Sequence, residues 1–413
     1  MARPSASQSA ERASMRVLLV SDWMTTSGGA ETYIVSLRDD LRAAGDEVQL
    51  LTCGAGPSGA GVADERAYGT DQVALQSVLQ VFNPFVVTRL RAVLRAFRPD
   101  VVLVGHFAYH LSPAIFAQLR AYPTVVTVMD YKVICPIGTK LLPNASLCAV
   151  PAGAVCWRNR CVSLPHWLRD RPRYALLRPG LAGVDRVLCC SRWLQHELAL
   201  GGVSAEHVPP PVAPPGPEFS RWPASEPSFI YCGRLSSEKG VDLLLRAFAG
   251  LRSDVPNARL RIVGDGPQRV ALESLVVSLG LGGAVTFVGR VAPGDVGREF
   301  ADAWALVAPS LWAEPFGLIA LEAIVRNVPV VASAVGGFAE TVAPGQSGLL
   351  FANGDEAALR GCMRSVADRT AFPSHTLPPD VVRRATESSS PRRHTERLQS
   401  VFREVVASST THR

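Results

Sequence analysis

The segment from Glu314 to Glu322 places two acidic side chains eight positions apart, on either side of a Pro-Phe-Gly turn. Pro315 lacks a backbone N–H and suits a loop or the first turn of a helix, and Gly317 lets the backbone approach a ligand closely. A helix beginning near Gly317 would offer free backbone N–H groups to an anion between the two acids. This pattern could hold a sugar, a diphosphate and a ribose in a row, although a surface helix with two solvated acids would look the same.

A second group of candidates follows the apolar run 228–232, which is a predicted strand. Arg234 offers a planar fork of donors, and Lys239 offers a compact positive charge. Two cations on one strand-to-helix loop could clamp a diphosphate. The alternative is a pair of solvated surface cations.

Three glycine-bearing loops also follow predicted strands, at residues 21–32, 264–267 and 335–340. The first could offer backbone N–H groups to a phosphate from Gly28 and Gly29 at a loop-to-helix junction. It lacks the Gly-x-Gly-x-x-Gly pattern, which argues against a dehydrogenase. Each loop could also be an ordinary turn.

The elements that must position these loops are short apolar runs that alternate with segments of helical periodicity. The runs lie at residues 15–20, 47–51, 100–104, 124–129, 186–190, 228–232, 259–263, 284–288, 304–307 and 328–332. Continuously apolar strands are covered on both faces, and strand–helix alternation predicts parallel sheets. The predicted fold class is therefore α/β, with two Rossmann-like doubly wound parallel-sheet domains. Since ligands bind beyond the C-terminal ends of such strands, we expect the site in the cleft between the domains.

Proline dominates residues 208–227, which therefore cannot form a helix or a central strand. We interpret this stretch as a stiff linker between an N-terminal domain at 15–207 and a C-terminal domain at 228–394. Residues 1–14 are predicted to be a disordered leader, and 395–413 to hold a C-terminal amphipathic helix.

The composition limits the classes of function. A chain of 413 residues that is 47% hydrophobic can form two cores, and its net charge of +6 suits an anionic ligand or membrane headgroups but is too small to indicate nucleic acid. No run of 18 apolar residues predicts a membrane span, and residues 1–14 lack the apolar region of a secretory signal. Nine cysteines, an odd number, favour a reducing cytoplasm over a disulfide framework.

In this order the motifs resemble those of the retaining glycosyltransferases of family 4, which have the two-domain GT-B fold. The resemblance covers nearly the whole chain after Met15. The matching motifs are Gly28-Gly29-Ala30-Glu31, Gly233-Arg234 through Glu238-Lys239-Gly240, Gly264-Asp265-Gly266-Pro267, Pro309-Ser310, the segment from Glu314 to Glu322, and Gly336-Gly337 with Glu340.

The resemblance implies roles for these positions. Arg234 and Lys239 would neutralise the donor diphosphate, Glu314 would contact the hydroxyls of the donor sugar, and Glu322 would accept hydrogen bonds from the ribose. The remaining donor-binding positions would be Gly28, Gly29, Asp265, Gly266, Phe316, Gly317 and Leu318. The C-terminal domain would hold the donor, the N-terminal domain would shape the acceptor pocket, and the last helix would cross back onto the N-terminal domain.

The implied reaction moves a sugar, with retained anomeric configuration, from a nucleotide-diphosphate donor to a glycan, a lipid-linked or a small-molecule acceptor. Because cations and a helix dipole would stabilise the leaving group, we predict no catalytic metal ion and no required cofactor. No enzymatic nucleophile is needed either, in contrast to two-carboxylate hydrolases.

One departure from the family pattern is Met129, which stands where a histidine is usual and cannot donate a hydrogen bond. His106 could supply that polar contact instead, or could simply pack at a strand end. Met129 is also the feature that favours a non-catalytic nucleotide-sugar-binding scaffold subunit. A sugar-nucleotide epimerase of the same fold is a further alternative.

Four cysteines, Cys135, Cys148, Cys156 and Cys161, could bind structural zinc or an iron–sulfur cluster. Their spacing lacks a close Cys-x2-Cys pair, so buried thiols or a disulfide are alternatives. Similar cysteine-bearing insertions occur in family members that assemble exopolysaccharide, capsule or lipid-linked glycans.

The segment that follows the cysteines interleaves arginines, from Arg158 to Arg178, with tryptophan, leucine and tyrosine. It could dock to anionic lipid, which would place the protein on the inner face of the membrane, or it could be a solvated basic face.

Overall fold

The computed structural model describes residues 14–22, 29–54, 63–107, 110–292 and 294–411. The predicted leader at 1–14 lies outside this range except for Ser14.

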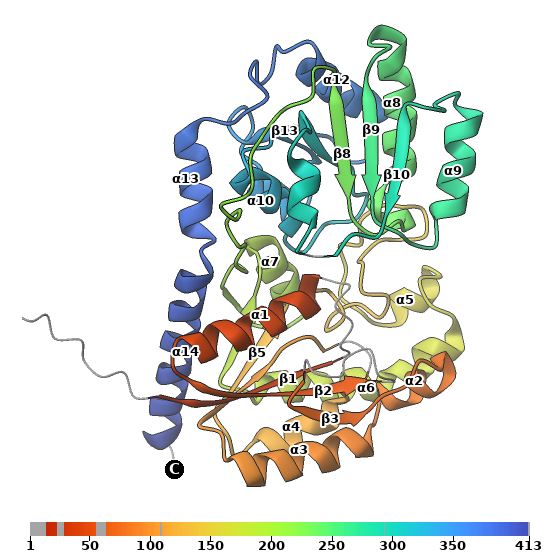
Figure 1. Cartoon of the computed structure of the whole chain (residues 1–413). Helices are drawn as coiled ribbons and strands as arrows, with labels where there is room; N and C mark the ends of the chain where they lie inside the picture. Colours follow the sequence, from red (N-terminus) through yellow and green to blue (C-terminus); the bar gives the residue numbers. More distant parts are fainter. Residues whose placement is uncertain (1–13, 23–28, 55–62, 108–109, 293, 412–413) are drawn as a thin grey trace, which may run out of the picture.

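The N-terminal domain, the lower one in Figure 1, is built on a seven-stranded sheet in the order β3-β2-β1-β4-β5-β6-β7. Its strands are β1 (Arg16–Ser21), β2 (Glu47–Gly54), β3 (Glu65–Tyr68), β4 (Val101–Val104), β5 (Thr124–Val128), β6 (Arg186–Cys189) and β7 (Glu206–His207). Its helices are α1 (Gly29–Ala43), α2 (Val73–Leu79), α3 (Pro84–Phe97), the 3-10 turn η2 (Pro113–Ile115), α4 (Phe116–Leu119), α5 (Ala154–Arg158), α6 (Leu164–Ala182) and α7 (Arg192–Leu200).

The C-terminal domain holds a six-stranded sheet in the order β10-β9-β8-β11-β12-β13. Its strands are β8 (Ser228–Cys232), β9 (Arg259–Val263), β10 (Val285–Gly289), β11 (Ala305–Ala308), β12 (Val330–Ser333) and β13 (Gly348–Phe351). The helices of this half are η3 (Ser237–Lys239), α8 (Val241–Asp254), α9 (Arg269–Ser278), η4 (Val296–Phe300), α10 (Leu318–Val325), α11 (Phe338–Thr341), α12 (Glu356–Ala367), α13 (Pro379–Ser388) and α14 (Pro391–Thr411).

The predicted fold class is confirmed. All strand pairs in both sheets are parallel, and each sheet begins with a central strand, adds two strands on one side and then continues on the other. This order is that of doubly wound Rossmann-like sheets. Figure 1 shows β8, β9 and β10 pointing toward the N-terminal domain, so the loops at their C-terminal ends face that domain.

Successive side chains of a strand point to opposite faces of the sheet, so each sheet packs against a hydrophobic core on both of its faces. In β1, Leu18 and Val20 pack in a cluster with α3, whereas Val17 and Leu19 pack in another with α1. In the C-terminal sheet, Phe229 belongs to the cluster that contains α8. Both faces of the strands are thus buried, as their continuously apolar sequences predict.

Helix α14 packs on the N-terminal domain although it follows the C-terminal one. Leu398, Val401, Phe402 and Val405, spaced along one face of the helix, join the core cluster of β1 and α1. In Figure 1, α13 and α14 (blue) run from the upper domain to the lower one. Residues 208–227 contain no helix or strand.

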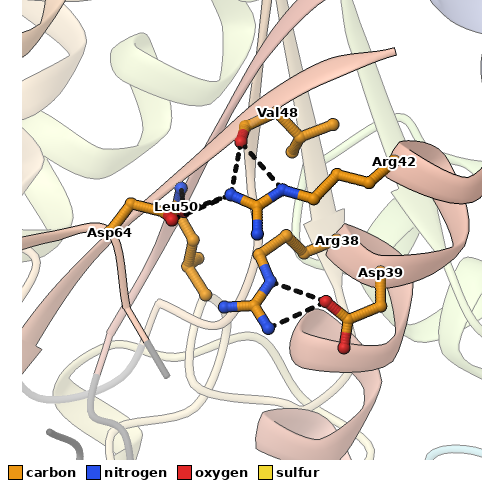
Figure 2. Close-up of polar contacts among 6 residues, drawn as sticks. All are labelled: Arg38, Asp39, Arg42, Val48, Leu50 and Asp64. Carbon is orange, nitrogen blue, oxygen red and sulfur yellow. Dashed lines mark hydrogen bonds and ion pairs between the residues drawn. The ribbon is translucent and has the colours of Figure 1, made fainter. Parts of the chain in front are cut away.

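A polar network anchors the C-terminal end of α1 to the sheet (Figure 2). Arg42 donates from Nε and Nη2 to the carbonyl of Val48, at 3.1 and 2.7 Å, and from Nη2 to the carboxylate of Asp64 at 2.8 Å. The same carboxylate accepts from the backbone N–H of Leu50 at 2.8 Å. These contacts hold the C-terminal end of α1 against β2.

Three strands were not among the apolar runs of the sequence. Strands β3, β7 and β13 are two to four residues long and have half-exposed or charged positions, and α13 forms within a polar stretch. Each lies at a sheet edge or on the surface, where the apolar signal is weak.

Within the described residues, no single helix has both the length and the apolar character to cross a bilayer. The α2–α3 pair, bent by 55°, passes that test by length and composition only.

Candidate functional site

Glu314 lies at the centre of the candidate site, in the loop after β11. Its Oε1 accepts hydrogen bonds from Lys239 Nζ at 2.6 Å and from the hydroxyl of Ser310 at 2.7 Å. Only 8% of Glu314 is exposed. Lys239 follows β8 and Glu314 follows β11, which are neighbouring strands, so the sheet brings together two residues 75 positions apart.

The Lys239 loop is held by close backbone packing. Gly240, with φ of +66°, precedes α8, and a Cβ there would lie 2.2 Å from the carbonyl of Pro309. The carbonyl of Glu238 accepts from the N–H of Leu311 at 2.9 Å. Lys239 Nζ also lies 5.1 Å from the centre of the Trp312 ring, a cation–π distance. The loops after β8 and β11 therefore form one unit.

Arg234 lies beside this unit, on a loop that the Gly264–Gly266 turn supports. A Cβ on Gly264 would lie 1.9 Å from the carbonyl of Gly233, and the carbonyl of Asp265 accepts from the N–H of Leu235 at 3.0 Å. The Arg234 side chain is exposed and contacts no acid among the described residues. Its positive charge is therefore available to a ligand.

Helix α10 begins where the sequence predicted. Gly317 is its N-cap, with φ of +85°, and a Cβ there would lie 2.4 Å from the ring of Phe338. Phe316 packs against the core cluster of the N-terminal domain, and Leu318 opens the helix. The N-terminal end of α10 thus lies next to Glu314 in the chain, and its first N–H groups follow directly.

Glu322 lies one turn inside α10 and is half-buried. Its carboxylate contacts no hydrogen-bond donor in the described part of the chain. Burial raises the pKa of this carboxyl above its usual range, and the charge of Arg326 partly opposes the shift. A half-buried carboxylate without a donor from the protein is suited to accept from a ligand.

Side chains of the N-terminal domain donate hydrogen bonds to the backbone carbonyls on both sides of Glu314. The hydroxyl of Tyr131 donates to the carbonyl of Ala313 at 2.8 Å, and that of Ser191 donates to the carbonyl of Pro315 at 2.5 Å. Sequence reasoning missed both residues. Ser191 did carry a signal, since a serine before a predicted helix is a typical N-cap, and its Oγ accepts from Leu194 N–H at 2.9 Å.

Glu340 makes a further contact between the domains. Its carboxylate accepts from the backbone N–H groups of Arg192 and Trp193, at 3.0 and 2.5 Å. These are the first residues of α7, so the acid caps a helix of the other domain, where its charge also suits the helix dipole. The C-terminal strand ends of the two sheets therefore meet at this junction.

His106 lies at the C-terminal end of β4, with Nδ1 3.5 Å from the carboxylate of Asp130, and its carbonyl accepts from Asp22 N–H at 2.8 Å. Met129 packs against the core cluster of β1, α1 and α14. Of the two glycines expected at the phosphate, Gly29 begins α1 and Gly28 lies outside the described residues.

The structure does not gather the four candidate cysteine ligands into a metal site. All nine cysteines have free thiols, and no group of three or more His, Cys, Asp or Glu side chains within the described ranges could hold a metal ion. The thiol of Cys148 points to the carbonyl of Val150 at 3.7 Å, and that of Cys161 to the carbonyl of Asn159 at 4.0 Å. Each of these two thiols thus points to the backbone carbonyl two residues away in the chain.

Comparison with known proteins agrees with this geometry. Residues 217–371 match the family described as Glycosyl transferases group 1, and residues 27–214 match Glycosyltransferase Family 4. The chain is 30% identical over 395 residues to a glycogen synthase from Mycobacterium tuberculosis, which covers 86% of this chain and 87% of that protein. It is 37% identical over 158 residues to a D-inositol 3-phosphate glycosyltransferase from Nocardioides sp., covering 35% of this chain and 34% of that protein.

Solved structures show the same architecture. A sucrose-phosphate synthase from Thermosynechococcus elongatus superimposes with a TM-score of 0.73 at 24% identity, covering 95% of this chain and 100% of that one. HepE from Anabaena in complex with UDP-glucose gives a TM-score of 0.65 at 18% identity, with 95% and 100% covered. These similarities show the fold, and the full-length relative and the two family matches establish that the chain belongs to glycosyltransferase family 4, with the GT-B fold.

Proposed function

We propose that the chain is a retaining glycosyltransferase that moves a sugar from a nucleoside-diphosphate donor to a hydroxyl group of a glycan, lipid-linked or small-molecule acceptor. The contact between Lys239 and Glu314 carries the proposal, because it joins a cation and an acid on loops from adjacent strand ends. Arg234 lies on the same loop as Lys239 and pairs with no acid among the residues that the structure describes. Support also comes from the complex of HepE with UDP-glucose, a protein of the same fold.

In this proposal Arg234 and Lys239 face the diphosphate. The bond between the anomeric carbon and the β-phosphate oxygen breaks, and the leaving nucleotide gains negative charge that the two cations stabilise. The N-terminal end of α10 adds backbone N–H groups and a favourable dipole. The charge that a divalent ion balances in other transferases is balanced here by the protein.

The acceptor hydroxyl attacks from the face that the diphosphate leaves. Its oxygen bonds to the anomeric carbon, and its proton passes to the departing β-phosphate oxygen, so atoms and charge balance without an enzymatic nucleophile. Glu314 would orient the hydroxyls of the sugar, and Glu322 would accept from the ribose. Asp265 and Gly266 would support the donor through the loop that holds Arg234.

On the acceptor side, His106 is the proposed polar contact in place of the usual histidine. Its pairing with Asp130 orients the imidazole and links it to Tyr131, the next residue, which holds the Glu314 loop. Met129 is partly buried and packs against the core cluster of β1, α1 and α14, so its thioether replaces a polar group without leaving an unsatisfied donor.

Two measurements test the proposal. Thermal unfolding with UDP-, GDP-, ADP- and TDP-sugars should reveal the donor through stabilisation by mass action. The purified protein should then hydrolyse or transfer the sugar of that donor, and chelation of divalent ions with EDTA should leave the rate unchanged. Stabilisation without turnover would favour the scaffold alternative, and a changed sugar in the presence of donor alone would reveal an epimerase. Absence of stabilisation by every donor would refute the proposal.

A further inference from the structure

The segment from Val150 to Val184 carries most of the net positive charge of the chain. It contains six arginines and a single acid, Asp170, which is an excess of five positive charges in a chain whose net charge is +6. Asp170 is buried and pairs with Arg169 at 2.8 Å. Four of the arginines are exposed, namely Arg158, Arg160, Arg171 and Arg178. This surface is therefore strongly basic and has no exposed acid of its own.

The same segment exposes apolar side chains in a regular pattern. On α6, Leu164, Leu168 and Leu176 are exposed, the last two at 50% and 53%, and their spacing of four and eight residues places them along one side of the helix. Trp157, on the neighbouring α5, is also exposed and stacks on Trp167. Figure 1 shows α5 and α6 in the N-terminal domain, α5 at the side nearer the C-terminal domain. An exposed apolar row flanked by arginines is the arrangement of a helix that lies on a bilayer surface.

A pocket of about 240 Å³ lies beside this row. Its walls include the rings of Trp167 and Tyr174, the side chains of Arg171 and Arg178, and Asp170, whose carboxylate is paired with Arg169. Arg171 stacks over Trp167, with its guanidinium carbon 5.2 Å from the ring centre. Aromatic rings together with two guanidinium groups suit a small anionic group that is joined to an apolar chain, such as the headgroup of an anionic phospholipid.

The pocket is also connected to the acceptor side of the candidate site. The hydroxyl of Tyr174 donates to the carbonyl of Lys132 at 3.0 Å, two residues after Asp130. Lys132 Nζ in turn donates to the carbonyl of Pro136, which also lines the pocket. A lipid seated here would therefore be close in the chain to the acceptor-side residues.

We infer that the α5–α6 surface, defined by Trp157, Leu164, Leu168, Leu176 and the four exposed arginines, docks on a bilayer of anionic phospholipid. The leucines and Trp157 enter the interface, and the arginines contact lipid phosphates. Docking on the bilayer needs no nucleotide-sugar donor, so it can be tested independently of the proposed transfer reaction.

Charge complementarity selects this surface over the other apolar one of the N-terminal domain. Residues 68–85 expose six large apolar side chains but contain Asp71 and no lysine or arginine. Arg66 and Arg89 flank that patch, but Glu65 and Asp71 balance them, so residues 65–89 carry no net charge. The patch would therefore gain less from an anionic membrane than the α5–α6 surface.

Sedimentation of the full chain with vesicles tests the inference. The protein should bind vesicles of phosphatidylglycerol mixed with phosphatidylcholine, bind phosphatidylcholine alone far more weakly, and dissociate as salt is raised. Arg158→Gln with Arg160→Gln should weaken binding about 25-fold, since each arginine near an anionic surface contributes about fivefold. Leu168→Gln with Leu176→Gln should weaken it by about tenfold.

Matched controls come from the C-terminal domain and α14. Val270→Gln with Val277→Gln changes two side chains on α9 that are 75% and 79% exposed, and should leave vesicle binding unchanged. Arg298→Gln with Arg392→Gln removes two exposed arginines elsewhere and should do the same. All four double variants should keep the thermal midpoint and the donor hydrolysis rate of the parent protein.

Equal binding to neutral and anionic vesicles would overturn the inference, as would equal losses in the α5–α6 and control variants. A chain that binds no vesicle at all would also overturn it, and the surface would then be a contact for another protein.

Discussion

The hydroxyl of Tyr131 in the N-terminal domain donates a hydrogen bond to the carbonyl of Ala313 in the C-terminal domain, 2.8 Å away. Ser191 makes the equivalent contact to Pro315. Glu314 lies between these two carbonyls, so its position depends on contact with the opposite domain. If Glu314 contacts the donor sugar as proposed, its productive orientation should depend on closure of the two domains.

Tyr131→Phe should therefore lower turnover by about tenfold, the effect of one lost hydrogen bond, with little change in nucleotide affinity. Steady-state kinetics and nucleotide-dependent thermal shifts would separate the two quantities. Tyr122→Phe is the matched control, because its hydroxyl contacts the carbonyl of Leu94 within the N-terminal domain at 3.5 Å. Equal effects of the two substitutions on kcat would remove the positioning role.

Replacing Lys239 should affect catalysis more than binding, because its charge would act on the leaving diphosphate. Lys239→Met keeps most of the side-chain length and should reduce kcat by about 100-fold or more, with a change in KM of less than about tenfold. Arg246→Gln, on the exposed face of α8 and paired with Asp242, is the control and should leave both constants unchanged. A variant at Lys239 with parental kcat would contradict the assignment.

The elements that carry the site could be predicted because their signals are local. The run 228–232 coincides with β8, and the helix expected near Gly317 begins at Leu318. Asn327, which follows that helix, has φ of +62°, a left-handed conformation that asparagine tolerates. Apolar runs predict the strands, and glycine and asparagine predict the turns, because both signals depend on the local sequence and not on distant parts of the chain.

The contacts between the domains could not be predicted in this way. Tyr131 and Ala313 are 182 positions apart, and no local pattern encodes which carbonyl a tyrosine hydroxyl will reach. Edge strand β13 was missed because its four residues include two half-exposed leucines and a glycine. Tertiary packing determines both the contact between Tyr131 and Ala313 and the pairing of β13. Neither can be predicted from a local sequence pattern.

Glu322 offers a test in which stability and function change in opposite directions. Burial raises the pKa of its carboxyl, which means that the ionised form is disfavoured in the folded protein relative to the unfolded chain. Glu322→Gln should therefore raise the thermal midpoint of the free protein at pH 7. It should also weaken nucleotide binding by about tenfold, because an amide is a poorer acceptor for two ribose hydroxyls than a carboxylate.

Titration calorimetry with the nucleotide and thermal unfolding without it would measure the two effects separately. Glu387→Gln, at an exposed position of α13, should change neither. Unchanged nucleotide affinity in Glu322→Gln would rule out its contact with the ribose, whatever happened to the thermal midpoint.

His394 should make the attachment of α14 sensitive to acid. The residue is 7% exposed, its Nδ1 lies 2.9 Å from the carbonyl of Pro209, and its Nε2 lies 2.9 Å from the hydroxyl of Tyr33. A carbonyl can only accept, so Nδ1 carries the hydrogen and Nε2 accepts from Tyr33. The neutral imidazole thus joins α14, the proline-rich segment and α1, and a protonated ring would lose the bond from Tyr33.

Burial lowers the pKa of His394 to about 4, although its hydrogen bond to Pro209 opposes the shift. The unfolded chain binds the proton first, near pH 6.5, so stability from this group is complete above that pH and is lost as pH falls toward 4. At pH 5 the loss should be about 2 kcal/mol relative to pH 7. Urea unfolding at pH 7 and at pH 5 should show this loss of free energy of unfolding.

His394→Gln should be less stable than the parent protein at pH 7, but its stability should fall less between pH 7 and pH 5. The remaining sensitivity to acid is due in part to His375, whose pKa is also lowered to about 4. His166→Gln, at an exposed position on α6, should keep the full parental pH dependence, and a His394→Gln variant that also kept it would show that the acid sensitivity arises elsewhere.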